Sequence, residues 1–589
     1  MNKGMIKKFF ISMLGTIAGF WISLLILGLV GFGIIVGLVA SASGNDVAVK
    51  KNSVLYIELS GLIPDRYQPA DPLTIMRQQG DMSDALVDIV QAVRSAASDD
   101  RILGIYIDAA GSQIGKAAAE ELVEALRDFK QSGKWVLAYG DSYEQTDYLV
   151  ATQADAVCLN PVGAVDIHGL KTEVPFMKGL FDKLNIKMQV VRVGTYKSAV
   201  EPYILTEMSE PARLQMQVLL DTIWNYEKGT IAEARSLKAA DVDNWADSMI
   251  VCRPAKYMID NGAVDSLLYR RQVEDIIRER CDVDDDEDLP LITPTEYVST
   301  MTSCSAGQHH IAVLFASGDI VDSGEGGIVG DQMPSEIIAM ADDDNVKALV
   351  MRVNSPGGSA FASEQIWEAL EYFKSKGKPF YVSMGNYAAS GGYYISCGAD
   401  KIYANRSTLT GSIGVFGVVP DLSGLMNNHL GITFSTVSTN PNAFGLSTNR
   451  AMTKAEFDAM QSHVEVAYDL FTKRVAEGRH ISQDSVKVIG SGRVWSGADG
   501  LRIGLVDKIG TLSDAINDIA QQINIEPEKV VYYPAVEENF MQIIARHASQ
   551  NMQVGGNRID AETLKLIQFI NYVRTMAPIQ ARMQSLEIR

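Results

Sequence analysis

The segment EQIWEALEYFKSKGKPFYVSMGNYAASGGYYISCGADKI, residues 364–402, decides the fold because the sequence contains a second version of it. Residues 120–157 read EELVEALRDFKQSGKWVLAYGDSYEQTDYLVATQADAV, and aligning Asp155 with Asp400 sets an offset of 245 residues (400 minus 155). In both versions apolar residues recur at helical spacing as far as a glycine, and a β-branched or aromatic run follows. Each version therefore predicts a helix followed by a buried strand.

The similarity between the two halves extends beyond this segment. Further matching pairs are LYIELSGLIPD (55–65) with AVLFASGDIVD (312–322), ILGIYIDAAG (102–111) with VKALVMRVNSPGG (346–358), and NGAVDSL (261–267) with IGLVDKI (503–509). Each half alternates strands and helices, which is typical of an α/β domain with a largely buried sheet. One internal duplication predicts two homologous domains, 46–300 and 301–530.

A candidate nucleophile lies in the second half. In YAASGGYYIS (387–396), Ser390 stands between two alanines and two glycines. Small residues let the backbone turn sharply and let a substrate approach, but a serine hydroxyl is inert without a base. The repeat places Ser390 on Gln145, so the first half has no serine there and no paired glycines after it.

A candidate base lies in the first half. VVRVGTYKSAVEPY (190–203) holds Lys197 among apolar and small residues. Its counterpart in the second half is Asn442, and no lysine occurs between Lys401 and Lys454. One half retains a serine and the other a lysine, and this complementary loss predicts one site built between the two domains.

Four motifs together resemble the signal peptide peptidase A family, of the protease IV type with two tandem domains. They are NSPGGS (354–359), NYAASGGYYIS (386–396), TGSIGVFG (410–417) and GTYKSAVEPY (194–203). The resemblance implies a ClpP/crotonase-like spiral of ββα units and a serine protease with a Ser–Lys dyad. It also implies a membrane-attached, bowl-shaped homotetramer that cuts signal-peptide remnants and other apolar peptides.

The resemblance assigns roles to residues of this sequence. Ser390 would be the nucleophile, Lys197 the general base, and Ser412 the serine that orients the lysine. Gln145 and Thr146 depart from the pattern in the first half, so we expect one active site per chain.

The base must be neutral to accept a proton. A free lysine has a pKa of about 10.4, whereas a useful base titrates near pH 7–8. Burial of the ammonium at an apolar domain interface would lower the pKa by the required ~3 units. Glu201 would keep Lys197 charged if the two were paired, so we expect Glu201 to point away. The apolar residues expected around Lys197 are Val191, Val193, Ala199 and Val200.

Acyl transfer also needs donors for the developing oxyanion. The backbone N–H of Gly391, directly after the serine, is one candidate. The glycine turn NSPGG supplies the second, for which we favour Gly358, because Pro356 has no N–H.

The N-terminus predicts a membrane anchor in residues 1–45. Three lysines precede a stretch from Phe9 to Ala42 without any charged residue, which is long enough to span a bilayer with tilt. By the positive-inside rule the N-terminus would be cytoplasmic and the body periplasmic, as a single-pass protein of the bacterial inner membrane. The alternative is cleavage of a signal peptide at LVASASGND (38–46).

Composition excludes some partners and cofactors. A net charge of −20 argues against nucleic-acid binding. The acidic run CDVDDDEDLP (281–290) is typical of a solvated linker, with a cation or basic-peptide site as the alternative. The five cysteines have no zinc or disulfide spacing, and we expect no cofactor and no metal.

Other functional classes fit the sequence less well. GSQIGK (111–116) is a residue short of a P-loop and is followed by Ala117 instead of Ser or Thr, and HExxH is absent. A Ser–His–Asp protease of ClpP type stays open, although none of the seven histidines lies in a glycine-rich turn like that of Ser390. An acyl-CoA enzyme of crotonase fold conflicts with a membrane anchor. A non-catalytic membrane scaffold or chaperone is the remaining alternative.

The remaining residues, 531–589, are expected to form a C-terminal helical extension. Within AETLKLIQFINYVRTM (561–576), four apolar residues have helical spacing, and the helix would cover either a subunit joint or its own domain's core. The four residues are Leu564, Ile567, Ile570 and Val573.

Overall fold

The structure is a computed structural model that describes residues 15, 48–67, 84–284, 286–301, 307–324, 326–443, 445–535 and 579–583. The chain divides into two compact units. One unit, Met1–Lys50 with Ala70–Gly80 and Glu538–Gln553, lies almost wholly outside the described residues, as does the expected anchor. None of the helices within the described ranges combines the length and apolarity that a bilayer crossing needs. The other unit consists of Lys51–Pro69, Asp81–Glu537 and Val554–Arg589, and it contains the sheets, the helices and the candidate site.

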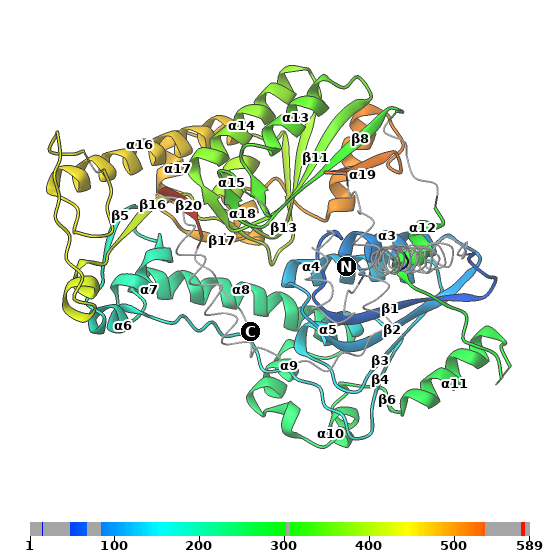
Figure 1. The fold of residues 1–589 in the computed structure, drawn as a ribbon. Helices are drawn as coiled ribbons and strands as arrows, with labels where there is room; N and C mark the ends of the chain where they lie inside the picture. The colour runs from blue at the N-terminus through cyan, green and yellow to red at the C-terminus, as the bar shows by residue number, and fades with distance from the viewer. Residues whose placement is uncertain are drawn as a thin grey trace, which may run out of the picture. The chain divides into compact units, whose positions relative to one another are not determined.

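The first half of the chain forms a parallel sheet (Figure 1). Its strand order is β6-β4-β3-β2-β1-β7, and every pair of neighbours is parallel. The apolar runs seen in the sequence form its central strands, which are buried because helices cover them. The strands are β1 (Ser53–Gly61), β2 (Ile102–Ser112), β3 (Trp135–Gly140), β4 (Ala156–Leu159), β6 (Ser266–Leu267) and β7 (Leu291–Ile292).

The second half forms a sheet with the same strand order. The series β18-β14-β13-β11-β8-β19 is parallel throughout and matches β6-β4-β3-β2-β1-β7 strand for strand. Two extra strands, β15 and β17, extend it beyond β13. The strands are β8 (His310–Ser317), β11 (Val346–Ser355), β13 (Phe380–Ala389), β14 (Lys401–Ala404), β15 (Leu409–Gly411), β17 (Val494–Ser496), β18 (Lys508–Ile509) and β19 (Val530–Tyr533).

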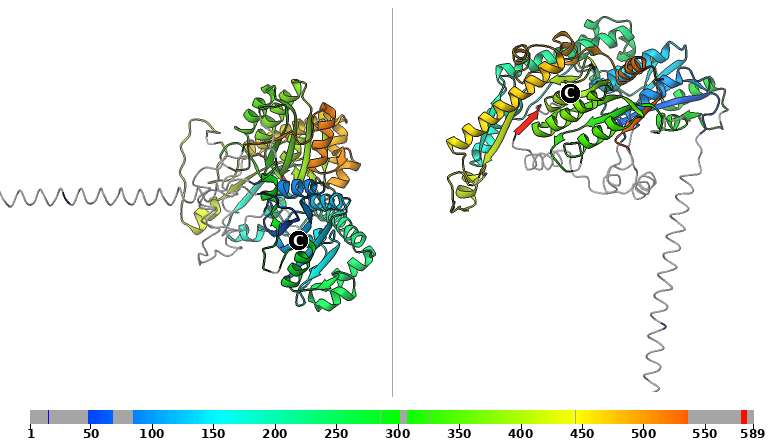
Figure 2. Two further views of the ribbon diagram at one scale, coloured as in Figure 1. Left: turned by 90° about the vertical axis from the view of Figure 1, so that its right-hand side faces the viewer. Right: turned by 90° about the horizontal axis from the view of Figure 1, so that it is seen from above.

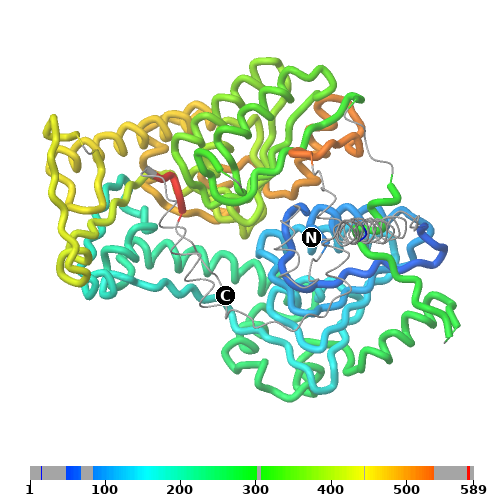
Figure 3. Tube along the Cα trace, in the orientation of Figure 1, coloured from blue at the N-terminus to red at the C-terminus, as the bar shows by residue number. Residues whose placement is uncertain are grey.

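A third, mixed sheet contains strands from both halves. Its order is β10-β9-β12-β20-β16-β5. Only β5 comes from the first half, and β20 comes from the far C-terminal region, drawn in red in Figure 3. The strands are β5 (Lys187–Val193), β9 (Ile320–Val321), β10 (Ile328–Val329), β12 (Gly357–Ser359), β16 (Val415–Asp421) and β20 (Ile579–Arg582).

The sequence predicted a helical extension over residues 531–589. The described parts of this region, 531–535 and 579–583, contain strands. β19 crosses the predicted boundary at residue 530 and joins the second sheet, and β20 joins the mixed sheet. The predicted helix at 561–576 lies outside the described residues.

Helices cover the sheets, and several of them begin at a serine or threonine whose side chain caps the first turn. The N-cap Thr453 of the long helix α16 accepts a hydrogen bond from Glu456 N in a capping box. This helix packs along β5 and β16 (Figure 2). The helices of the first half are α3 (Leu86–Ala96), α4 (Lys116–Lys130), α5 (Gln145–Ala151), α6 (Lys178–Lys183), α7 (Glu201–Ile204), α8 (Glu210–Ala234), α9 (Ala239–Asp247), α10 (Ala255–Asp260), α11 (Arg270–Cys281) and α12 (Pro294–Ser299). Those of the second half are α13 (Met333–Asp342), α14 (Ala360–Ser375), α15 (Gly391–Ser396), α16 (Lys454–Arg479), α17 (Gln483–Ile489), α18 (Gly497–Arg502) and α19 (Leu512–Ile523).

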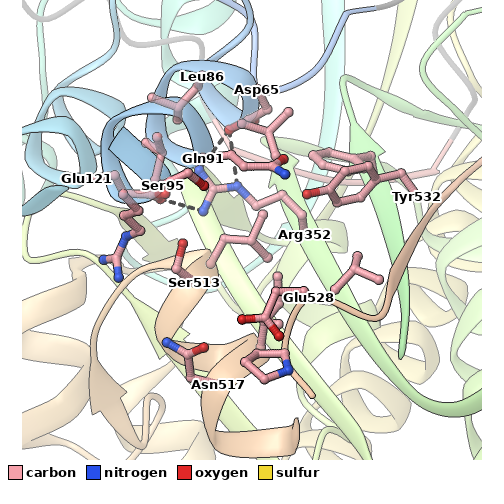
Figure 4. Close-up of a pocket in the computed structure, with 18 of the residues that line it drawn as sticks. Asp65, Leu86, Gln91, Ser95, Glu121, Arg352, Ser513, Asn517, Glu528 and Tyr532 are labelled. Carbon is pink, nitrogen blue, oxygen red and sulfur yellow. Dashed lines mark hydrogen bonds and ion pairs between the residues drawn. The ribbon is translucent and has the colours of Figure 1, made fainter. Parts of the chain in front are cut away.

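A buried ion cluster joins the two halves. Arg352 of β11 is 1% exposed and donates to Asp65 and Glu121 of the first half at 2.7 and 2.6 Å. Figure 4 shows this cluster at the edge of a cavity of about 280 Å³. Burial raises the pKa of Glu121, and Arg352 opposes that shift. Removing one partner would leave a buried charge uncompensated, so the cluster resists separation of the halves.

Candidate active site

Ser390 stands at the junction of a strand and a helix. β13 ends at Ala389, α15 begins at Gly391, and Ser390 between them has φ 57° and ψ −113°. A non-glycine residue with positive φ is strained by roughly 1–3 kcal/mol. A strained strand-to-helix turn is how α/β hydrolases expose a serine nucleophile. Gly392 is needed here because a Cβ on it would lie 2.6 Å from Ser355 O.

Lys197 reaches this turn at the end of an extended strand. β5 pairs antiparallel with β16 up to Val193, opposite Val415. The chain then turns, and Tyr196 N donates to Ser491 O at 2.9 Å. Lys197 follows directly, against a glycine of the second half.

The amine of Lys197 lies between two serine hydroxyls. Nζ is 2.8 Å from Ser390 Oγ and 3.0 Å from Ser412 Oγ, and it also donates to Ser412 O at 3.1 Å. Lys197 is 1% exposed, and no carboxylate in the described ranges forms an ion pair with it. Burial therefore lowers the pKa of Lys197 well below its ordinary value of 10.5. A neutral amine in this place can accept the hydroxyl proton of Ser390.

Glu201, the residue that could have kept the lysine charged, is engaged elsewhere. Its carboxylate accepts hydrogen bonds from Ser209 Oγ at 2.6 Å and Ser209 N at 3.1 Å. Arg192 lies 3.9 Å from it. As expected from the sequence, Glu201 does not pair with Lys197.

Ser412 is fixed by its backbone. It has φ 49°, and its N–H donates to Arg493 O at 2.7 Å. Its hydroxyl and carbonyl both face the lysine, and neither carries a charge that would stabilise an ammonium. Ser412 therefore directs Nζ without restoring its positive charge.

The two glycines expected to stabilise an oxyanion lie side by side. A Cβ on Gly391 would lie 3.1 Å from Gly358 N. The neighbouring Gly357 has φ 98°, and a Cβ on it would lie 2.6 Å from Gly391 N. The backbone nitrogens of Gly358 and Gly391 therefore lie close together next to Ser390, as a pair of oxyanion donors requires.

The equivalent position in the first half holds a different set of groups. Gln145 is buried at the start of α5, where its Nε2 donates to Glu227 at 2.9 Å and its Oε1 accepts from the backbone N–H of His168 and Gly169. Lys116 pairs with the same Glu227 at 2.9 Å. Each of these side chains is occupied by a hydrogen bond or ion pair, so this cluster is arranged for packing.

Histidines bond away from the serine. His310 is buried, with ring nitrogens at 2.7 Å from Gln308 O and 3.1 Å from Tyr533 Oη. His168 bonds to Asp166, and His429 to Asn185. Within the part of the chain that the structure describes, no histidine hydrogen-bonds to Ser390.

Two residues that position the lysine could not be recognised from the sequence motifs. Gln215 of α8 donates to Tyr196 O at 3.2 Å and to Ser198 Oγ at 3.0 Å, on either side of Lys197. Gly492 has φ 78°, and a Cβ on it would lie 2.6 Å from Lys197 Cβ. The only hint in the sequence is the SGR motif around Gly492. A glycine after a serine predicts a turn, but it does not predict which side chain packs against that glycine.

The fold and site together define a class of enzyme. A parallel α/β fold carries a strained serine beside a buried amine, and residues 325–412 match the Clp protease family. The chain is thus a serine protease with a ClpP-like fold.

Residues 128–284 and 372–526 each match Peptidase family S49, and the chain belongs to this family. "Protease 4" of Salmonella typhi is 36% identical over 522 residues, covering 86% of this chain and 83% of the relative. "Protease 4" of Haemophilus influenzae is 33% identical over 530 residues, covering 86% and 85%. "Serine protease SPPA, chloroplastic" of Arabidopsis thaliana is 29% identical over 493 residues, covering 82% and 71%. The resemblance inferred from the four motifs is confirmed.

Proposed function

We propose that the chain is a membrane-anchored endopeptidase in which Ser390 and Lys197 form a Ser–Lys dyad that degrades cleaved signal peptides and other apolar peptides. The observation that carries the proposal is the 2.8 Å separation of Lys197 Nζ and Ser390 Oγ, with the lysine buried and without a carboxylate partner in the described residues.

The mechanism follows from these positions. Ser390 Oγ attacks the carbonyl carbon of the peptide bond while its proton passes to the neutral Lys197 Nζ. The N–H groups of Gly358 and Gly391 stabilise the oxyanion that forms. Lys197 then donates the proton to the leaving amine, and water hydrolyses the acyl ester by the reverse sequence. Ser412 holds Nζ in place throughout.

The proposal is tested by labelling and by activity. A fluorophosphonate should label Ser390, and wild-type enzyme should cut a leader-like apolar peptide that Ser390→Ala leaves intact. Ser396→Ala is the matched control, because Ser396 is a buried serine of the same short helix whose Oγ donates to Gly392 O at 2.6 Å. Labelling of another residue, or equal activity of Ser390→Ala, would favour a histidine-based site, and a wild-type chain without label or activity would favour a non-catalytic scaffold.

The anchor, compartment and assembly belong to the same proposal. The uncharged stretch from Phe9 to Ala42 supports one inner-membrane span with the domains 46–300 and 301–530 in the periplasm. Protease added to intact spheroplasts should digest the body, and a body that stays uncut contradicts this orientation. The family resemblance supports a homotetramer, which native mass spectrometry of the detergent-solubilised protein measures.

A further inference from the structure

The strand that leads to the candidate nucleophile contains a β-bulge. Val353 of β11 pairs with Met384 of β13, but the next pair along the same two strands is Ser355 with Ala388. Between these pairs β11 has one residue, whereas β13 has three, 385–387, which form the bulge. A bulge bends its strand and re-aims the side chains beyond it, and bulges are frequent next to active sites.

The bulge changes the partner of β13. Before the bulge β13 pairs with β14, and after it β13 pairs with β15. β15 ends at Gly411, whose carbonyl oxygen accepts a hydrogen bond from Ser390 N at 2.7 Å, and Ser412 follows in the chain. The equivalent strands of the first half, β2 and β3, keep a single register over all of their paired residues. The bulge therefore belongs to the half that carries the serine, and it brings Ser390 beside the strand that leads to Ser412.

Asn386, the middle residue of the bulge, bonds to the other half of the chain. Its Oδ1 accepts hydrogen bonds from Ala117 N and Ala118 N at 3.1 and 3.2 Å. Both N–H groups belong to the first turn of α4, whose own N-cap is Gly115 and provides no side-chain cap. A helix leaves its first N–H groups without partners, and an amide oxygen at this place satisfies two of them. Asn386 of the second half thus caps a helix of the first half.

Gly115 leaves the room that this contact needs. A Cβ on Gly115 would overlap the side-chain amide of Asn386. The helix α4 packs against β13, so the two residues meet where the halves touch (Figure 1). The glycine and the asparagine therefore form one contact, with the start of α4 on one side and the bulge on the other.

Two further contacts hold the same bulge and the same helix. Asn354 of β11 lies opposite the bulge, where it accepts a hydrogen bond from Tyr387 N at 3.1 Å and donates to Asp65 of the first half. Glu120 of α4 accepts a hydrogen bond from Arg406 N at 2.8 Å, in the loop before β15. The first half thus holds both β13 at its bulge and the approach to β15, the two segments that lead to the two serines.

We propose that Asn386 is a positioning residue for catalysis, which by capping α4 holds the bulge at the angle that aims Ser390 at Lys197 Nζ. It acts through the backbone of β13 and not by contact with the reacting atoms. A displacement of about 1 Å from the reacting geometry can cost on the order of 10²-fold in rate. The loss of the cap should therefore lower kcat and leave KM nearly unchanged. This inference rests on the proposed dyad.

The first experiment removes and then restores the acceptor at Asn386. Asn386→Leu keeps the size of the side chain, and its kcat for a leader-like peptide should fall at least ~10-fold with KM within about twofold of wild type. Labelling of Ser390 by a fluorophosphonate should slow in parallel. Asn386→Asp should retain at least about half of the wild-type kcat, because a carboxylate accepts from the same N–H groups and is favoured at a helix start. A wild-type kcat in Asn386→Leu, or an Asn386→Asp as slow as Asn386→Leu, overturns the inference.

Thr293→Ala is the matched control for the loss of a helix cap. Thr293 Oγ1 accepts a hydrogen bond from Glu296 N at 3.3 Å at the start of α12, which packs on α3 and β1. Thr293→Ala and Asn386→Leu should lower the urea midpoint of unfolding by similar amounts, but Thr293→Ala should keep its kcat within about twofold of wild type. An equal loss of kcat in the two variants would assign the effect to general destabilisation and would contradict a positioning role.

The second experiment approaches the contact from the other half. Gly115→Ala should lower kcat at least ~10-fold, because its Cβ would displace the amide of Asn386. Asn386→Ala removes the group that is displaced, so the double variant should lose no more kcat than the more damaging single variant. Additive losses would show that the two residues act separately.

The two proposals fail differently. If another residue than Ser390 is labelled, or Ser390→Ala keeps its activity, the proposed dyad is wrong. If Ser390 is labelled and the wild-type chain cuts leader-like peptides, but Asn386→Leu does so equally fast, the dyad stands and only the role of Asn386 is overturned.

Discussion

Replacing Lys197 by methionine should stabilise the protein, and more so at lower pH. The amine is fully buried without an ion-pair partner in the described residues, and burial lowers its pKa well below the value of 10.5 that it has in the unfolded chain. At a pH between these two values the amine is neutral in the folded chain and charged in the unfolded chain. The unfolded state then binds one more proton than the folded state. Stability consequently rises with pH across the window between the lowered folded pKa and the unfolded value. Methionine has a similar length and does not titrate.

The magnitude follows from linkage. One proton bound only in the unfolded state changes the unfolding free energy by about 1.4 kcal/mol per pH unit. The stabilisation of Lys197→Met over its parent should therefore shrink between pH 7 and pH 9, by about 2.7 kcal/mol at most.

Urea unfolding at pH 7, 8 and 9, followed by tryptophan fluorescence, measures this difference. Both proteins should carry Ser390→Ala, so that proteolysis during the measurement does not interfere. Lys454→Met is the matched control, because the side chain of Lys454 is 88% exposed and stays solvated in both states. A difference between Lys197→Met and its parent that stays constant from pH 7 to pH 9, or grows, would show that the lysine is charged in the folded protein and would refute its assignment as base.

Three further substitutions test the same site, each by the rate of hydrolysis of a leader-like peptide. Ser390→Ala should lower kcat by about 10⁴–10⁶ without changing the far-ultraviolet circular dichroism, and activity within tenfold of wild type would sink the assignment. Lys197→Arg should be as inactive as Lys197→Ala, because a guanidinium does not lose its proton in proteins; substantial activity in the arginine variant would indicate an ion pair instead. Gly492→Ala should lower kcat, since its Cβ would press on Lys197 Cβ at 2.6 Å, and unchanged kcat would contradict that contact.

The sheet architecture could be predicted because the same pattern of strands and helices occurs in both halves of the sequence. The alignment of Asp155 with Asp400 corresponds to two sheets with the same strand order, and the two aspartates make the same contact: Val136 N donates to Asp155 Oδ2, and Phe380 N donates to Asp400 Oδ2. Hydrophobic periodicity reports such elements well, since each strand and helix is a local feature of the sequence.

The mixed sheet could not be predicted in the same way. β5 pairs with a strand more than 220 residues away, and β12 with one a similar distance off. The sequence of neither strand indicates its partner. Alternation of apolar and polar residues along a strand specifies only which face of the strand is buried. The complementary loss of serine and lysine predicted that Ser390 and Lys197 share one site, but it carried no information about the strand β20 that joins the mixed sheet.

Dividing the proposed dyad between the halves would also control the charge of the proposed base. The burial of Lys197 is produced by the second half, through Ser412, Gly492 and the strand β16, while the lysine itself belongs to the first. In a first half that lacked this cover the amine would be solvated and would regain its ordinary pKa, so it would hold its proton at neutral pH. Contact between the halves therefore brings Nζ to Ser390 and, by burying the amine, lowers its pKa, which favours the neutral form that the proposed dyad requires. The buried pairing of Arg352 with Asp65 and Glu121 stabilises that same contact, which links the neutral state of the lysine to the assembled fold.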